Sequence, residues 1–314
     1  MTALATLKRK LSNGRAFANF RGAVFFAQRR IRSLEARHRA ARLMARVLPA
    51  GSVAERGSDA VASRLEQQGF VILDLVTSQQ AHEMREHFQR QPVYAPYLAN
   101  SPRVLLDEAD QIDSHVLWHE DPAVLSCPHA LDIANHPMVL AAMQAVLGCK
   151  PTIGYMTAWW SVPTADGVPR HAENFHRDVD DLKFIKLFVY LTDVGEGNGP
   201  HEYIRGSHGD SRLSRIRRYG DEEILQTFGE DSLVRFTGPA GRAFLENTYG
   251  MHRGQPVQTG RRLIFQVVYS LLPLVYGPAR PYPATVAAAT SRVLDPYINR
   301  RYLAPARPQE PSRG

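Results

Sequence analysis

Two histidines and one aspartate have the residue types needed to bind a single metal ion. His176 and Asp178 form a His-x-Asp pair. In an extended chain both side chains point to the same side, so they can bind one ion together. Another histidine, His252, follows much later in Met-His-Arg-Gly. Because a His-x-Asp triplet is common by chance, the motifs around it must decide its meaning.

Several further motifs follow this pair in a fixed order. They are Tyr-Leu-Thr-Asp at 190–193, Asn-Gly-Pro at 198–200, Gly-Ser-His at 206–208, the distal His252 and Gly-Arg-Arg at 260–262. The order resembles that of the phytanoyl-CoA dioxygenase family, a branch of the Fe(II)- and 2-oxoglutarate-dependent oxygenases. The resemblance runs from about residue 65 to residue 271, and the combination is far more specific than any single motif.

The resemblance implies that His176, Asp178 and His252 are the ligands of a catalytic Fe(II). Two imidazoles and one carboxylate leave three positions of an octahedral Fe(II) open, as in other non-haem oxygenases. It also implies that 2-oxoglutarate and O2 use those positions. A hydrogen-bond acceptor is expected beside each imidazole. Asp178 favours hydroxylation over halogenation, because halogenating relatives carry a small residue in its place.

An arginine is expected to bind the far carboxylate of 2-oxoglutarate, because its guanidinium is planar and permanently charged. Arg261 and Arg262 are adjacent, so only one of them can point inward. Arg262 shares a polar strand face with Gln266, and the family pattern also favours Arg262. Lys186 interrupts an apolar strand, so it either contacts the co-substrate or lies at a rim.

Other residues near the motif are candidates for the pocket wall. Thr157 shares one face of a predicted strand with Tyr155 and Trp159, and the family often lines its cavity from that element. His171 is expected in a lid. His201 is expected either at the surface or beside the cavity.

The predicted secondary structure that positions these residues changes at Lys150 from mostly helices to mostly strands. Beyond it the sequence predicts short strands separated by Gly, Pro, Asn and Asp, at 152–161, 184–193, 201–205, 232–236, 242–246 and 262–271, with one helix at 221–228. This pattern favours a sandwich, jelly roll or barrel. The predicted fold is mainly β with flanking helices (α+β). The resemblance implies a double-stranded β-helix core, of the jelly-roll or cupin type, at about 150–272.

The first half of the chain is predicted to be largely helical. An apolar strand at 69–75 leads into a helix with a capping box from Thr77 to Gln80. Residues 91–125 show no clear period and are interpreted as irregular cover, in which His115 and His119 lie near a surface turn. A single amphipathic helix is expected over 130–147.

Basic residues are concentrated in the first fifty positions. Residues 1–50 carry a net charge of +11 and the remaining chain −4, within a total of +7. Breaker residues at 49–52 place a boundary between a basic helical arm, 1–50, and a dioxygenase domain, 51–314. The arm is interpreted as a helix, at 25–48, that rests on the body; a presequence or a helix on an anionic membrane surface are alternatives. The acidic body argues against specific nucleic-acid binding.

Composition limits the class of protein further. The 314 residues are 44% hydrophobic, but no apolar run approaches the ~20 residues of a membrane span. Only two cysteines occur, Cys127 and Cys149, without a Cys-x-x-Cys motif. This usage is typical of a reducing compartment, so a cytoplasmic enzyme is expected.

The sequence therefore predicts a dioxygenase that hydroxylates an aliphatic C–H bond of a small organic substrate and releases succinate and CO2. Five arginines and one acid lie between Arg205 and Arg218, which indicates an anionic substrate such as a carboxylate, a phosphorylated compound or a coenzyme A thioester. The alternative is a non-catalytic, cupin-like protein that binds a metal or a small molecule.

Overall fold

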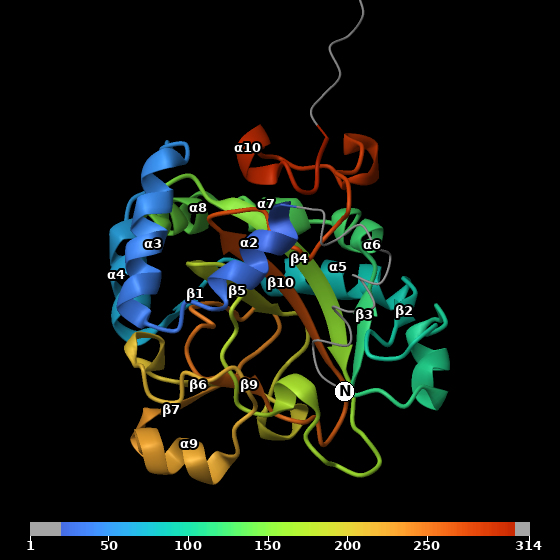
Figure 1. Cartoon of the computed structure of the whole chain (residues 1–314). Coiled ribbons are helices and arrows are strands. Elements are labelled where there is room, and N and C mark those ends of the chain that lie inside the picture. Colours follow the sequence, from blue (N-terminus) through green and yellow to red (C-terminus); the bar gives the residue numbers. More distant parts are fainter. Residues whose placement is uncertain (1–19, 305–314) are drawn as a thin grey trace, which may run out of the picture.

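Two antiparallel sheets form the centre of the protein in a computed structural model that describes residues 20–304 (Figure 1). The larger sheet has the strand order β1-β8-β5-β10-β4-β3-β2, and the smaller has the order β7-β6-β9. The strands are β1 Phe70–Leu73, β2 Val93–Tyr94, β3 Val116–His119, β4 Thr152–Ser161, β5 Phe184–Tyr190, β6 His201–Ile204, β7 Leu233–Phe236, β8 Ala243–Glu246, β9 His252–Gly254 and β10 Arg262–Ser270. This confirms the predicted α+β fold with a double-stranded β-helix core.

Side-chain alternation along the central strands explains how the sheet is buried on both faces. Every residue of β5 and β10 is buried. Leu187 and Phe265 point to one face and pack with the helices of the first half. Phe188 and Ile264 point to the other face and pack against residues of the smaller sheet. Because the period is two, Arg262 and Gln266 share the second face and lie between the sheets.

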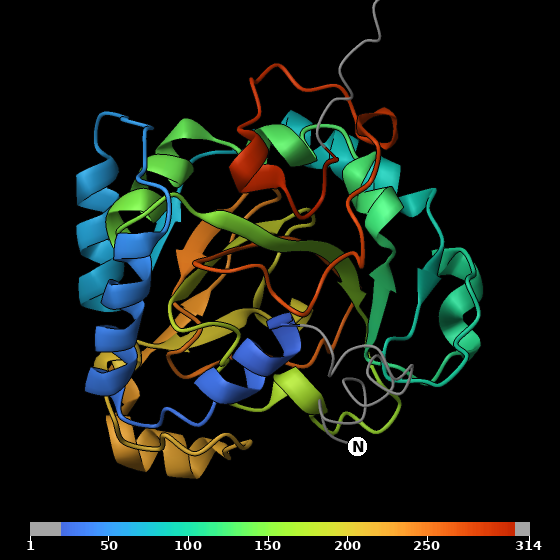
Figure 2. The ribbon, with the colours of Figure 1, turned by 45° about the horizontal axis from the view of Figure 1, so that its top comes forward.

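Helices cover the outer face of the larger sheet (Figures 1 and 2). They are α4 Ser58–Gln68, α5 Ser78–Gln89, α6 Asp121–Leu125, α7 Ala130–Ala134 and α8 Pro137–Leu147, and α10 Pro296–Asn299 adds Ile298 to the same core. The remaining helix α9 covers Asp221–Phe228. The predicted capping box between Thr77 and Gln80 is present at the start of α5.

The single helix expected over 130–147 is wrong, because the chain breaks between α7 and α8. Pro137 cannot continue a helix, and it occupies the first turn of α8 instead. The side chain of His136 caps α8 by accepting a hydrogen bond from the Met138 amide. By length and composition alone Ala130–Leu147 is apolar enough to span a membrane, but 72% of it is buried inside the protein, as in a core helix.

The irregular cover expected over 91–125 is also partly wrong. β2 and β3 extend the larger sheet, and β3 pairs with β4 so that Trp118 lies opposite Trp159. The short apolar run Val116-Leu117-Trp118, with a β-branched and an aromatic residue, is the sequence signal for this strand. Both histidines are buried, so neither lies in a surface turn.

The N-terminal arm rests on the body as two helices rather than one. α2 covers Phe20–Gln28 and α3 covers Leu34–Val47, and the chain turns between them. Ser33 caps α3 by accepting a hydrogen bond from the Ala36 amide, which explains the break. Ala41 and Ala45 pack against Leu147 and other body residues. The part of the arm over 1–19 lies outside the described residues.

His119 provides a test of the fold through its pH dependence. Its ring packs against Phe88 at 4.7 Å, and burial lowers its pKa to about 4. Because the unfolded pKa is about 6.5, this histidine stabilises the fold fully above pH 6.5 and loses that contribution as the pH falls toward 4. The shift corresponds to about 3 kcal/mol.

A His119→Phe variant should therefore lose less unfolding free energy between pH 7 and pH 4 than the wild type, as measured by urea denaturation. Met84→Leu provides the control, because it changes a buried residue of the same core without removing a titratable group and should keep the wild-type pH dependence. Equal pH dependence in His119→Phe and the wild type would contradict the prediction.

Candidate metal centre

Pairing between the two halves of the core brings His176 and His252 together. The two residues form an isolated antiparallel bridge, with His176 N donating to His252 O at 3.0 Å and His252 N donating to His176 O at 3.1 Å. Ser207 of the Gly-Ser-His corner accepts a hydrogen bond from the Met251 amide at 2.7 Å, which fixes the chain just before His252.

The side chains of the His-x-Asp pair point to the same side of the chain, as the sequence analysis predicted. His176 and Asp178 point into the interior, whereas Arg177 points to the opposite side. The Arg177 guanidinium donates hydrogen bonds to the carbonyl oxygens of Ser207 and Tyr249, at 2.8 and 2.7 Å. Arg177 thereby anchors this extended segment to neighbouring loops, while the two flanking side chains face one site.

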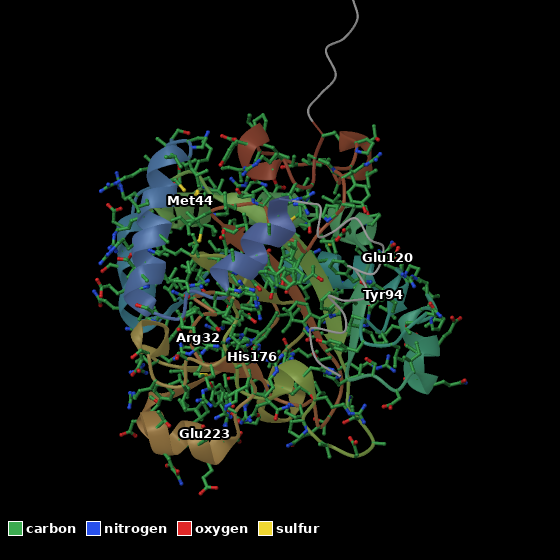
Figure 3. All side chains as sticks on the ribbon, in the orientation of Figure 1. Arg32, Met44, Tyr94, Glu120, His176 and Glu223 are labelled. Carbon is green, nitrogen blue, oxygen red and sulfur yellow. The ribbon has the colours of Figure 1, made fainter. Side chains whose placement is uncertain are left out.

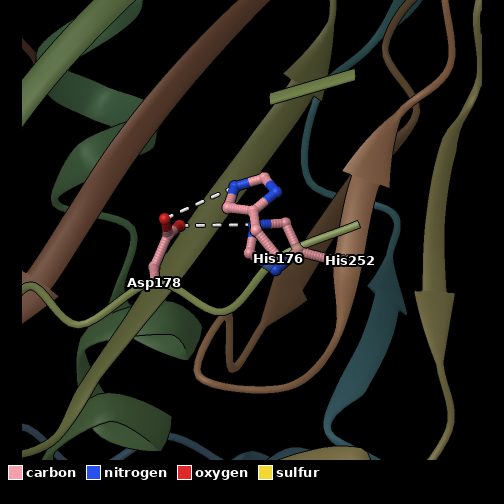
Figure 4. Close-up of side chains that lie close together, drawn as sticks. All are labelled: His176, Asp178 and His252. Atoms are coloured by element: carbon pink, nitrogen blue, oxygen red, sulfur yellow. Dashed lines mark ion pairs between the residues drawn. The ribbon is translucent and has the colours of Figure 1, made fainter. Parts of the chain in front are cut away.

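The three side chains converge closely enough to bind one ion (Figure 4). His176 Nε2 lies 3.5 Å from Asp178 Oδ1, and His252 Nε2 lies 3.3 Å from Asp178 Oδ2. One ligand atom from each residue lies within 4.8 Å of the others. A common ion can therefore contact all three with ordinary metal–ligand distances of about 2.0 to 2.2 Å.

The backbone holds both imidazoles in the tautomer that can bind a metal. His176 Nδ1 lies 2.9 Å from the carbonyl oxygen of Asn174, and His252 Nδ1 lies 3.0 Å from that of Gly250. A carbonyl oxygen only accepts, so each Nδ1 carries a proton, and Nε2 is the nitrogen that faces the position of a metal ion. These carbonyls are the acceptors that the sequence analysis expected but could not identify.

Lys186 neutralises the carboxylate of the site. Its Nζ lies 2.7 Å from Asp178 Oδ2 and 3.0 Å from Asp180 Oδ2, and its side chain is 6% exposed. Burial opposes ionisation of Asp178, but Lys186 and His252 lower its pKa well below the usual range. Burial lowers the pKa of His176 to about 3, so this imidazole is neutral at pH 7.

A cavity of about 220 Å³ opens beside the three residues. Thr157 of β4 and Gln266 of β10 lie opposite each other in the sheet and line the cavity together with Lys186. Gln266 Nε2 donates a hydrogen bond to the Tyr155 hydroxyl at 3.0 Å. Trp159 also faces the cavity, so the strand face predicted to line the pocket does so.

Arg262 lies in the same cavity with donors that have no partner. Its Nη2 donates to Ser161 Oγ at 3.0 Å, whereas Nε and Nη1 are buried without a hydrogen-bond partner among the described residues. The adjacent Arg261 lies outside the cavity and pairs with Asp107 and Asp110. A buried guanidinium with free donors is costly unless an anion binds it.

Comparison with models of known protein families identifies the family of this chain. Residues 65–263 match the family model described as "Phytanoyl-CoA dioxygenase (PhyH)". The chain belongs to the phytanoyl-CoA dioxygenase family. It is therefore a member of the Fe(II)- and 2-oxoglutarate-dependent oxygenases, and its His176, Asp178 and His252 form a triad-like group.

Solved structures with a similar arrangement are distant in sequence. HygX from Streptomyces hygroscopicus, solved with nickel and 2-oxoglutarate bound, is 15% identical, with a TM-score of 0.46 over 69% of this chain and 87% of that chain. EctD from S. alaskensis in its apoform is also 15% identical, with a TM-score of 0.47 over 71% and 81%. No curated protein sequence matches the chain.

Several cavity residues of this phytanoyl-CoA dioxygenase family member were missed by the sequence analysis. Tyr97 and His171 stack with ring centroids 3.7 Å apart, and His115 lies parallel to both. Tyr97 and His115 line the cavity from the segment interpreted as irregular cover. Only the tertiary structure brings them to the site, because no motif marks them.

His201 proves to be a neighbour of the cavity rather than a surface residue. Its Nε2 lies 2.8 Å from Glu246 Oε2, and its ring stacks on His252 with centroids 5.6 Å apart. Glu246 is fully buried, and burial raises its pKa to about 8. The pair lies beside His252, and His201 lines the cavity.

Proposed function

We propose that the protein hydroxylates an aliphatic C–H bond of a small organic substrate, consuming 2-oxoglutarate and O2 and releasing succinate and CO2. The observation that carries this proposal is the convergence on one cavity of the triad and of Arg262, two of whose donors, Nε and Nη1, have no hydrogen-bond partner among the described residues. The triad could bind a metal ion that chelates a keto acid, and Arg262 could bind a carboxylate. The co-substrate 2-oxoglutarate carries both groups.

The donor set fits Fe(II). His176 and His252 would supply Nε2 atoms and Asp178 a carboxylate oxygen, a combination used for Fe(II) in non-haem oxygenases. When bound, the iron supplies the redox chemistry that activates O2. Lys186 holds the second oxygen of Asp178, which keeps the carboxylate oriented and leaves one oxygen for the ion.

Arg262 would hold the far carboxylate of 2-oxoglutarate through its free Nε and Nη1 donors. Thr157 and Gln266 line the same cavity as Arg262 and the triad. Lys186 was one candidate for co-substrate contact, but its ammonium already binds Asp178 and Asp180. We therefore assign Lys186 to positioning of the triad.

Anaerobic addition of Fe(II) and 2-oxoglutarate to the apo protein tests this proposal. A chelated complex should produce a weak visible charge-transfer band, and admission of O2 with a substrate should release succinate. Absence of the band would overturn the assignment of the site. A band without succinate release from any tested substrate would favour the alternative, a non-catalytic protein that binds a metal and a small molecule.

Arg262→Gln is expected to raise the KM for 2-oxoglutarate about a hundredfold, because a buried charge pair is worth several kcal/mol. Arg261→Gln is the matched control: it removes the same charge from the neighbouring position but leaves the cavity intact. Steady-state succinate release at varied concentrations of 2-oxoglutarate measures the KM of both variants. Equal effects of the two substitutions would contradict the role of Arg262.

A negatively charged substrate is favoured by Arg218. Arg218 lines the cavity, and it forms no ion pair among the described residues. The nearby Arg212 and Arg217 are instead paired with Asp210 and Glu223. Of the arginines in this loop, Arg218 is therefore the one placed to meet a substrate in the cavity.

Arg218→Gln should raise the KM for an anionic substrate about tenfold, the effect of losing one charged hydrogen bond, while the KM for 2-oxoglutarate stays constant. Arg217→Gln is the control, because Arg217 is already neutralised by Glu223. The measurement is succinate release at varied substrate. An unchanged substrate KM in Arg218→Gln would remove the support for an anionic substrate.

A further inference from the structure

A second concave surface, separate from the metal cavity, lies where the N-terminal arm meets the body. We call it the basic groove. Its volume is about 390 Å³, and it is lined by Arg29, Ile31, Arg32, Arg37, Val179, Ser214, Arg215, Ile216 and Tyr249. Four of these nine residues are arginines, and none is an aspartate or glutamate. Arg32, labelled in Figure 3, lies just before α3 begins.

The arginines of the basic groove form no ion pairs within the described part of the chain. Many other arginines of the protein do, including Arg212 and Arg217 in the adjacent loop. Arg32 and Arg215 are exposed, and their guanidinium groups have no hydrogen-bond partner among residues 20–304. Two free guanidinium groups therefore face one recess.

The inner arginines are held in place by neutral oxygens. Arg37 is only 2% exposed, and it donates hydrogen bonds to the carbonyl oxygens of Gln28 and Asp181 and to the Gln28 side chain. Arg29 donates to the carbonyl oxygen of Val179 at 3.0 Å. These bonds orient the guanidinium groups, while the carboxylates of Asp180 and Asp181 act on Arg37 through space without forming an ion pair. Such a buried charge is costly unless an anion compensates it.

We propose that the basic groove binds the phosphate group of a phosphorylated small molecule. Several converging guanidinium forks match the geometry and multiple charge of phosphate better than a single carboxylate. Ile31, Ile216 and Tyr249 provide apolar surface for an organic part of the same ligand. Because Arg37 is recessed, a flat membrane surface cannot reach it, and the acidic body argues against a long nucleic acid.

The groove is adjacent to the metal cavity through two stretches of chain. Asp178 lines the cavity and the next residue, Val179, lines the groove. Ile216 lines the groove and Arg218 lines the cavity. The phosphate can therefore belong to a substrate that reaches the triad or to a separate effector. Three of the four groove arginines precede residue 65, where the family match begins, so the groove is a feature of this chain's own arm.

Calorimetric titration of the full chain with inorganic pyrophosphate, without metal or 2-oxoglutarate, tests the proposal. Saturable binding is expected, and the double variant Arg32→Gln/Arg215→Gln should weaken it at least about tenfold. Both residues are exposed and unpartnered, so the fold should be retained. The matched control is Arg30→Gln/Arg64→Gln, which removes the same charge from exposed positions outside the groove and should change the affinity less than twofold.

Three results would overturn the proposal: no saturable binding, equal loss in the control variant, or binding to vesicles of phosphatidylglycerol that depends on Arg32 and Arg215 while pyrophosphate does not bind. Because the titration omits iron, its failure leaves the proposed oxygenase reaction untouched. Once a substrate is known, competition between pyrophosphate and that substrate would identify the groove as part of the substrate site. A change in kcat without competition would identify an effector site.

Discussion

Asp178→Ala should abolish succinate release and weaken binding of Mn(II) or Co(II) more than about a hundredfold. Loss of an outer-shell partner of a metal ligand already costs 10- to 100-fold, so loss of a ligand should cost more. The fold should survive, because Lys186 keeps its second partner Asp180 and no unpaired buried charge is created. Metal titration in the absence of O2 measures the affinity independently of turnover.

Asp180→Asn is the matched control for this experiment. Asp180 also pairs with Lys186, but it does not belong to the group of three converging ligand atoms. Its substitution removes the same formal charge two residues away and should leave metal binding within a few-fold of the wild type. Metal affinity in Asp178→Ala equal to that of Asp180→Asn would show that Asp178 is not a ligand.

Lys186→Met should lower the free energy of unfolding by about 3 to 5 kcal/mol in the presence of a chelator, the cost of breaking a buried ion pair by removing one partner. The substitution leaves Asp178 and Asp180 facing each other without a cation. Urea denaturation measures the change. Added Mn(II) should restore part of the loss, because an ion bound at Asp178 replaces the missing positive charge.

Two further variants show whether charge, rather than packing, is responsible. Lys183→Met removes a lysine whose ion-pair partner, Glu66, is largely exposed, and it should cost less than about 1 kcal/mol. The double variant Lys186→Met/Asp180→Asn should recover stability relative to Lys186→Met, since only one carboxylate then remains unpaired. No recovery in the double variant would contradict the electrostatic explanation.

Part of the site's arrangement could be predicted from short sequence patterns, because the direction in which neighbouring side chains point depends only on the local backbone conformation. The alternation of an extended chain places His176 and Asp178 on one side, and the same rule separates Arg262 from Arg261. Strand segments were also predictable, since β4 and α9 have the predicted bounds and most other strands differ by one to three residues. The order of the family motifs then indicated which distant histidine, His252, completes the group.

Other features of the site depend on contacts that no local pattern encodes. Tyr97 and His115 reach the cavity only because β2 and β3 join the large sheet beside β4. The two-helix arm was not predicted either, because Ser33 capping and packing of Ala41 on the body outweigh the continuous helical periodicity.

The sequence by itself determined the residue types of the triad-like group, their order and the alternating strands, because these follow from residue chemistry and a period of two. Only the tertiary structure decided that Lys186 neutralises Asp178 and Asp180, that Arg262 keeps free donors, and that the arm's arginines meet Arg215 in one groove. Those outcomes depend on which charges become neighbours after folding, and residues far apart in the sequence acquire partners only when the sheets close around them.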